Sequence, residues 1–94
     1  MRWNGKVYKI LYHKKAIKEM EYLKRRNLEN KTKQLIEIIK KNPYQNPPPY
    51  EQLVGDLKGL YSRRINIQHR LVYQIDEDAQ RIKILSMWTH YENT

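Results

Sequence analysis

The first stretch of patterned residues, 6–12, is rich in β-forming side chains and alternates, which predicts a strand. From about Lys14 the period changes. Apolar residues recur there every three or four positions between charged ones, which indicates an amphipathic helix that ends near Asn27. A second helical pattern begins at about Glu29 and stops before Pro43, because proline disfavours helix at the residue before it. Two helices separated by Asn27 predict a helical hairpin.

Residues 42–50 are rich in proline and predict an irregular connection. After it, residues 61–67, 69–76 and 81–91 read as three strands joined by short turns, hence an antiparallel meander. The order β-α-α-β-β-β predicts an α+β fold in which the helical hairpin packs on one face of a sheet. We expect residues 1–94 to form a single domain, because neither half of so short a chain could bury a core alone.

Composition adds a strong basic excess. The chain has 19 Lys and Arg against 10 Asp and Glu, a formal net charge of +9. Residues 1–41 hold 13 basic and 4 acidic side chains, while residues 42–94 hold 6 of each, so the excess lies in the helical half. A basic face suits nucleic acid, although a basic surface without a particular partner fits the charge equally well.

Other features of the composition bear on the location of the protein and on whether it binds a metal or cofactor. The chain has no cysteine, and no apolar run approaches the roughly 20 residues that a membrane span needs. We expect a cytoplasmic protein without membrane association. Its three histidines are far apart and its acids do not cluster at ligand spacing, so we expect no metal and no cofactor.

Two arginines of the first predicted hairpin give the most specific indication of a binding site. Side chains alternate along a strand, so if the apolar residues of both strands face one core, Arg64 and Arg70 share the opposite face. A turn centred on Ile67 then places them directly across from each other, where like charges are destabilising. That arrangement makes sense if an anion such as phosphate lies between them. Alternatively, one arginine pairs with an acid such as Glu51 or Asp56, or lies on a solvated face.

The segment from about Pro49 to Tyr91 resembles the YoeB/Txe family of toxin–antitoxin ribonucleases, within the wider RelE-like group. The residues that carry the resemblance are Ser62-Arg63-Arg64-Ile65, His69-Arg70-Leu71-Val72-Tyr73 and His90-Tyr91. The resemblance implies two helices against a twisted antiparallel sheet, and metal-independent cleavage of mRNA in the ribosomal A site. It also implies a cognate antitoxin of the YefM/Phd type as partner, and it is compatible with a homodimer.

Carried over residue by residue, the resemblance places the family's catalytic glutamate on Glu51, its arginines on Arg64 and Arg70, and its last two catalytic groups on His90 and Tyr91. Glu51 would be the general base and His90 the general acid. The arginines would stabilise charge on the phosphoryl oxygens, and Tyr91 would orient the base or the leaving group. In the family the histidine and tyrosine commonly close the chain, whereas here residues 92–94 follow.

We assign binding of RNA or the ribosome to Arg63 and to three lysines of the first helix, Lys14, Lys15 and Lys18. Two other classes of function compete with the ribonuclease. One is a non-catalytic, ParE-like toxin that inhibits DNA gyrase, and the other is a basic RNA-binding protein. An acid–base pair that flanks two arginines favours the ribonuclease over both.

Overall fold

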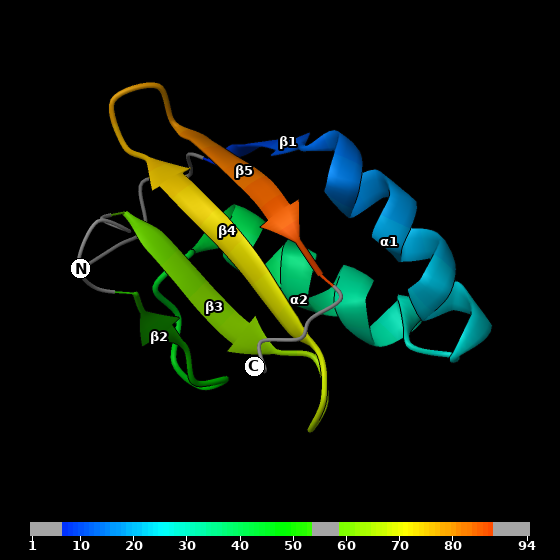
Figure 1. Cartoon of the computed structure of the whole chain (residues 1–94). Coiled ribbons are helices and arrows are strands. Elements are labelled where there is room, and N and C mark those ends of the chain that lie inside the picture. The colour runs from blue at the N-terminus through cyan, green and yellow to red at the C-terminus, as the bar shows by residue number, and fades with distance from the viewer. Residues whose placement is uncertain (1–6, 54–58, 88–94) are drawn as a thin grey trace.

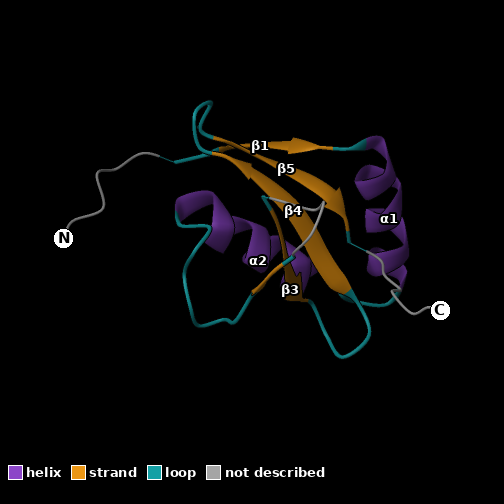
Figure 2. Cartoon of the chain, turned by 60° about the vertical axis from the view of Figure 1, so that its left-hand side comes forward, coloured by secondary structure: helices purple, strands orange, loops and turns teal. Residues whose placement is uncertain are grey.

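The computed structural model describes residues 7–53 and 59–87 of the chain. Two helices, α1 (Lys14–Arg25) and α2 (Glu29–Lys41), pack on one face of a sheet, as Figures 1 and 2 show from two sides. The strands are β1 (Lys9–Tyr12), β2 (Glu51–Gln52), β3 (Leu60–Arg64), β4 (Arg70–Asp76) and β5 (Arg81–Ser86). Their order in the sheet is β1-β5-β4-β3-β2. The α+β class and the helical hairpin are therefore confirmed.

One feature of the predicted sheet is wrong. β1 pairs with β5 in parallel, with Lys9 opposite Arg81 and Tyr12 opposite Ile84, so the sheet is mixed. The pairs β4–β5, β3–β4 and β2–β3 are antiparallel, as a meander requires. Alternation of side chains marks β1 as a strand, but it carries no information on the direction of a partner that lies 72 residues away. The short strand β2 was not predicted, because it lies beside the proline-rich segment.

Both helices begin and end where the local chemistry dictates. The Nδ1 of His13 accepts a hydrogen bond from the amide of Lys15 at 3.0 Å and caps the start of α1. α1 ends at Arg25; Asn27 then adopts the left-handed conformation, with a φ of 61°, and the amide of Leu28 donates to the carbonyl of Leu23 at 2.9 Å. α2 ends before Pro43, as predicted.

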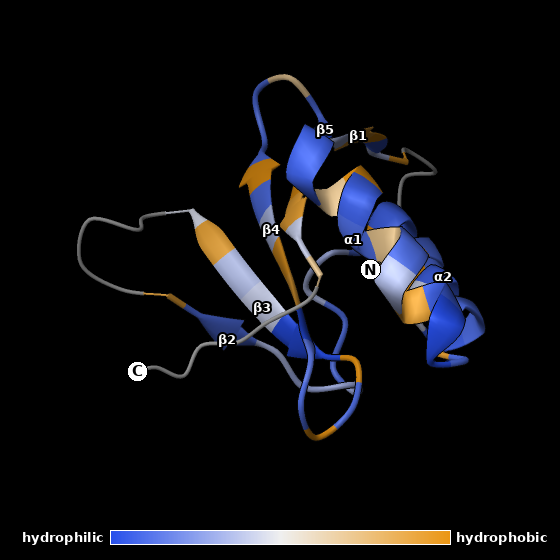
Figure 3. Cartoon of the chain, turned by 45° about the vertical axis from the view of Figure 1, so that its right-hand side comes forward, coloured by the Kyte–Doolittle hydropathy of each residue, from blue (hydrophilic) through white to orange (hydrophobic). Residues whose placement is uncertain are grey.

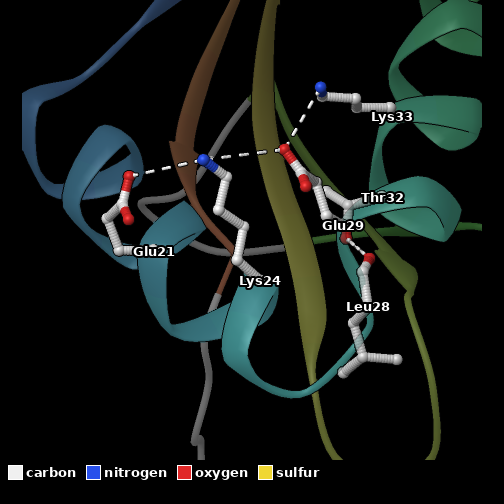
Figure 4. A network of polar contacts seen from close by, with 6 residues as sticks. All are labelled: Glu21, Lys24, Leu28, Glu29, Thr32 and Lys33. Atoms are coloured by element: carbon white, nitrogen blue, oxygen red, sulfur yellow. Dashed lines mark hydrogen bonds and ion pairs between the residues drawn. The ribbon is translucent and has the colours of Figure 1, made fainter.

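Figure 4 shows the polar contacts around the junction of the two helices, where the Lys24–Glu29 pair connects α1 to α2. Lys24 of α1 lies 3.9 Å from Glu21 and 4.0 Å from Glu29 of α2, and Glu29 also pairs with Lys33 at 3.2 Å. The hydroxyl of Thr32 donates to the carbonyl of Leu28 at 2.8 Å. These ion pairs are largely exposed and add little to stability.

The core lies between the helices and the sheet. From α2 it takes Leu35, Ile36 and Ile39, and from the sheet it takes the fully buried Leu71, Tyr73, Ile82 and Ile84. Each such side chain contributes about 1.5–3 kcal/mol through burial. Most of the ribbon of both helices is coloured hydrophilic in Figure 3, although Ile17 of α1 is exposed. Neither helix of the described ranges is long and apolar enough to cross a membrane.

Candidate active site

The hairpin of β3 and β4 brings Arg64 and Arg70 together. Arg64 is the direct cross-strand partner of Arg70, which confirms the predicted register. Asn66 holds the connecting turn, because its side-chain oxygen accepts from the amides of Gln68 at 2.8 Å and His69 at 2.7 Å. A turn fixed by its own side chain leaves little freedom for the register to slip.

A pocket of about 150 Å³ opens beside this pair of arginines. The residues that line it are Pro48, Pro49, Tyr50, Glu51, Ser62, Arg64 and Arg70. This volume holds more than one water molecule and is large enough for a phosphate group. Three of the five predicted catalytic residues therefore line one cavity.

Glu51 reaches the pocket through β2. The pairing of β2 with β3 sets Glu51 opposite Ser62, on the same rung of the sheet as Val72 of β4. Arg70 donates from Nη1 to Glu51 Oε1 at 3.2 Å and to Ser62 Oγ at 3.1 Å. The pairing of one arginine with Glu51, which the sequence left open, is thus present. Arg64 is exposed and forms no ion pair within residues 7–53 and 59–87. Within these ranges its charge is therefore free, whereas that of the neighbouring Arg70 is partly balanced by Glu51.

Arg63 does not have the role predicted for it. Its side chain is 1% exposed, and its guanidinium donates to Tyr73 Oη at 2.9 Å, to the carbonyl of Pro43 at 3.0 Å and to the carbonyl of Pro48. A group enclosed in this way cannot contact RNA, so that assignment is wrong. The alternation of side chains along the strand indicates this burial. Arg63 alternates with Ser62 and Arg64 and shares the core face with Tyr61 and Ile65.

The buried guanidinium also affects its tyrosine neighbour. Burial raises the pKa of Tyr73 above its ordinary value of 10, and the charge and hydrogen bond of Arg63 partly offset that rise. The Tyr73 phenol therefore stays protonated at neutral pH, and its oxygen accepts the Nε–H of Arg63. The ring of Tyr50, which lines the pocket, lies 5.0 Å from the guanidinium carbon of Arg63.

The remaining predicted residues divide into two groups. Lys14, Lys15 and Lys18 are exposed on α1. α1 packs against β5, so it covers the β1–β5 side of the sheet, whereas the pocket lies at the β2–β3–β4 side (Figure 1). His90 and Tyr91 lie outside the described residues. Within the described ranges no group of three or more His, Cys, Asp or Glu is placed to hold a metal ion.

Ser62 is the pocket residue whose contact the sequence did not predict. It shares a face with Arg64 by strand alternation, but nothing in the sequence shows that its hydroxyl meets Arg70. Pro48, Pro49 and Tyr50 form the other wall, and they reach it only because the proline-rich segment turns back against β3.

Comparison with known sequences now bears on this site. The profile of the family described as "YoeB-like toxin of bacterial type II toxin-antitoxin system" matches residues 12–91, which include all three described pocket residues with predicted catalytic roles. The chain belongs to this family. A toxin YoeB from Synechocystis is 40% identical over 75 residues, which cover 79% of this chain and 77% of the relative. A toxin YoeB from Escherichia coli K12 is 37% identical over 49 residues, covering 52% and 58%.

Solved structures show the same fold. A YoeB/ParE toxin from Agrobacterium tumefaciens superposes with a TM-score of 0.79 at 29% identity, over 88% of this toxin and 99% of the other chain. A YoeB–YefM complex from Staphylococcus aureus gives 0.74 at 33% identity, over 89% and 98%. A DinJ–YafQ complex from E. coli gives 0.77 at 20% identity, over 90% and 94%, which shows a shared fold alone. This chain is therefore a toxin of a type II toxin–antitoxin system, of the YoeB/RelE type.

Proposed function

We propose that this toxin is a ribosome-dependent endoribonuclease that cuts mRNA in the A site without a metal and thereby inhibits translation. One observation carries the proposal: Glu51, Arg64 and Arg70 line a single pocket that is large enough for a phosphate group. A carboxylate and two guanidinium groups supply a proton acceptor and the stabilising charge that phosphoryl chemistry on RNA requires. A protein that only binds nucleic acid has no need of the carboxylate at this position.

The proposed reaction begins at the 2′-hydroxyl of the nucleotide 5′ to the cut. Glu51 takes the proton of this hydroxyl, and the oxygen attacks the adjacent phosphorus. The phosphate oxygens compete with Glu51 for Arg70, so substrate binding loosens the 3.2 Å ion pair and releases the carboxylate to act as a base. Arg64 and Arg70 stabilise the charge that builds on the phosphoryl oxygens.

The reaction ends when the bond from phosphorus to the 5′-oxygen breaks. His90 donates a proton to that leaving oxygen, and Tyr91 orients the base or the leaving group through its ring or hydroxyl. The products are a 2′,3′-cyclic phosphate and a 5′-hydroxyl. Lys14, Lys15 and Lys18 dock on ribosomal RNA, which places the action of the toxin in the cytoplasm.

The partners of this toxin form part of the same proposal. The S. aureus YoeB–YefM complex at 33% identity and the S. aureus YoeB dimer at 32% identity support a YefM-type antitoxin and a homodimer here as well. We also propose that residues 1–94 act as one domain, which the continuous core over the described ranges supports.

A reconstituted translation reaction tests the activity. We expect primer extension to show new 5′ ends within or beside the A-site codon, and Arg70→Ala or His90→Ala to reduce their formation about 10²-fold or more. Asn30→Ala, an exposed position on α2, serves as the control and should cleave like the wild type.

The same experiment can also contradict the ribonuclease proposal. If the wild-type toxin arrests growth but produces no new 5′ ends, the ribonuclease proposal is wrong. Inhibition of DNA gyrase in that case would identify the ParE-like alternative. If the toxin neither cleaves mRNA nor inhibits gyrase, the RNA-binding alternative remains.

A further inference from the structure

A single buried cation joins the proline-rich segment to the sheet. The guanidinium of Arg63 reaches both ends of residues 43–48, since it donates to the carbonyl of Pro43 at 3.0 Å and to that of Pro48. Its Nε donates to Tyr73 Oη on β4 at 2.9 Å. A buried charge is costly unless it is well bonded, and these three acceptors are neutral oxygens aimed at one guanidinium. The arrangement thus holds the segment through one side chain.

Tyrosine rings complete the contact between the segment and the sheet. Tyr61 of β3 stacks on Tyr73 at 6.0 Å, and it meets Tyr44 edge-on at 6.0 Å and Tyr50 edge-on at 5.8 Å. Tyr50 also lies over the guanidinium of Arg63. Both residues that flank residues 45–49 therefore pack on the same ring of β3, beside the buried cation.

Glu51 follows this segment directly, and its other contacts are the ion pair with Arg70 and a short strand pairing. β2 consists of Glu51 and Gln52 alone, both exposed, at the edge of the sheet. It pairs with Ser62 and Tyr61, and the next backbone bond runs from the amide of Leu53 to the carbonyl of Leu60 at 2.9 Å. So short an edge pairing is marginal by itself. Arg70 contacts the Glu51 carboxylate, but the backbone that carries this side chain depends on the residues before it.

We propose that Arg63 is a positioning residue: it clamps residues 43–50 to β4 and so sets Glu51 against Arg64 and Arg70. Its catalytic consequence rests on the proposed ribonuclease function, but the clamp itself does not. Ser62 and Arg64 face the pocket while Arg63 faces the core, so one strand carries both the anion-binding group and the anchor of the opposite wall. Lysine cannot replace Arg63, because a single ammonium does not provide a planar fork for three separated acceptors.

Amide hydrogen exchange tests the clamp without any nuclease assay. In Arg63→Lys we expect exchange to be about tenfold faster or more at Tyr44, Gln45 and Leu53, because local opening no longer breaks the charged hydrogen bonds of the guanidinium. Amides of Ile36 and Ile39 in α2 should exchange as in the wild type. Arg25→Lys is the matched control, since Arg25 is exposed and its guanidinium lies 6.0 Å from the ring of Tyr22.

Two exchange results would overturn the proposal. Unchanged exchange at residues 44–53 would show that Arg63 holds nothing there. Equal acceleration in α2 would show a core residue of general importance. If Arg63→Lys does not fold, Tyr73→Phe decides, because it removes only the hydroxyl that accepts from Arg63 and donates to the carbonyl of Pro43. We expect about threefold faster exchange at the same amides, and unchanged exchange would again overturn the clamp.

Cleavage then tests the link to Glu51. We expect Arg63→Lys to lower kcat about 10²-fold, as a displacement of about 1 Å does, and to leave KM near the wild-type value. In a Glu51→Gln background, Arg63→Lys should reduce kcat little further, because both substitutions act through the Glu51 carboxylate. Effects that multiply independently would overturn the positioning role. If the wild-type toxin does not cleave at all, the proposed function fails, while hydrogen exchange still decides the clamp.

Discussion

Three consecutive residues of β3 have three different environments. Ser62 is buried against Arg70, Arg63 is enclosed by carbonyl oxygens, and Arg64 is exposed beside the pocket. Strand alternation separates Arg63 from the other two, and the register with β4 then sets Arg64 opposite Arg70. Identical side chains at adjacent positions thus lie in opposite environments, one enclosed by the core and one at the edge of the pocket.

The opposed arginines predict a conflict between stability and activity. We expect Arg64→Gln to leave the free energy of unfolding unchanged or to raise it by up to about 1 kcal/mol, because it removes a like-charge pair. The same change should reduce mRNA cleavage about 10²-fold. Urea denaturation at low and high salt measures the first effect, which screening should diminish. A clear loss of stability would show that Arg64 has a structural role like that of Arg63.

At the scale of elements, α1 is joined to the end of β5 by a polar contact inside the core. Glu19 is 7% exposed, and its carboxylate accepts from the amide of Met87 at 2.9 Å. The helical period marks Ala16 and Leu23 as core residues, and both are fully buried, yet Ile17 is 59% exposed. The helix is therefore rotated so that a carboxylate, rather than an isoleucine, meets Met87 just after β5.

Glu19 gives an element-scale prediction. Glu19→Leu should lower the free energy of unfolding by about 1–3 kcal/mol, because it leaves the buried amide of Met87 without its acceptor. Glu19→Gln retains an acceptor oxygen and should cost less. Glu21→Gln, at an exposed position of the same helix, is the control and should change stability by less than about 0.5 kcal/mol. Thermal unfolding compares the three variants. A Glu19→Leu protein as stable as the wild type would contradict this account of the contact.

The whole molecule separates its basic surface from its pocket. The helical half carries the excess charge, and α1 lies toward the β1–β5 side of the sheet, whereas the pocket lies toward β2 (Figure 1). The charge on α1 therefore lies away from the pocket where we propose that cleavage occurs. Such charge contributes to affinity and to its salt dependence rather than to the chemical step.

This separation can be tested by charge removal. Changing Lys14, Lys15 and Lys18 to Gln should weaken ribosome binding and flatten its dependence on salt, while the cleavage rate of bound toxin stays at the wild-type value. The matched control changes Lys31, Lys33 and Lys41 of α2 to Gln. These lysines are also exposed, and their replacement removes the same charge. Binding and single-turnover cleavage measured from low to moderate salt distinguish the two variants. Equal weakening by both would mean that only net charge matters.

The sequence alone determined the elements whose causes are local. The 3.6-residue period and Pro43 marked both helices, and alternation within one hairpin was enough to place Arg64 opposite Arg70. Tertiary structure decided what depends on chain segments meeting from far apart. These are the parallel pairing of β1 with β5, the arrival of Glu51 beside Arg70, and the enclosure of Arg63 by carbonyls of a loop. The physical reason is that local periodicity specifies which face of an element is apolar, whereas the partner that covers this face is selected only when the chain packs.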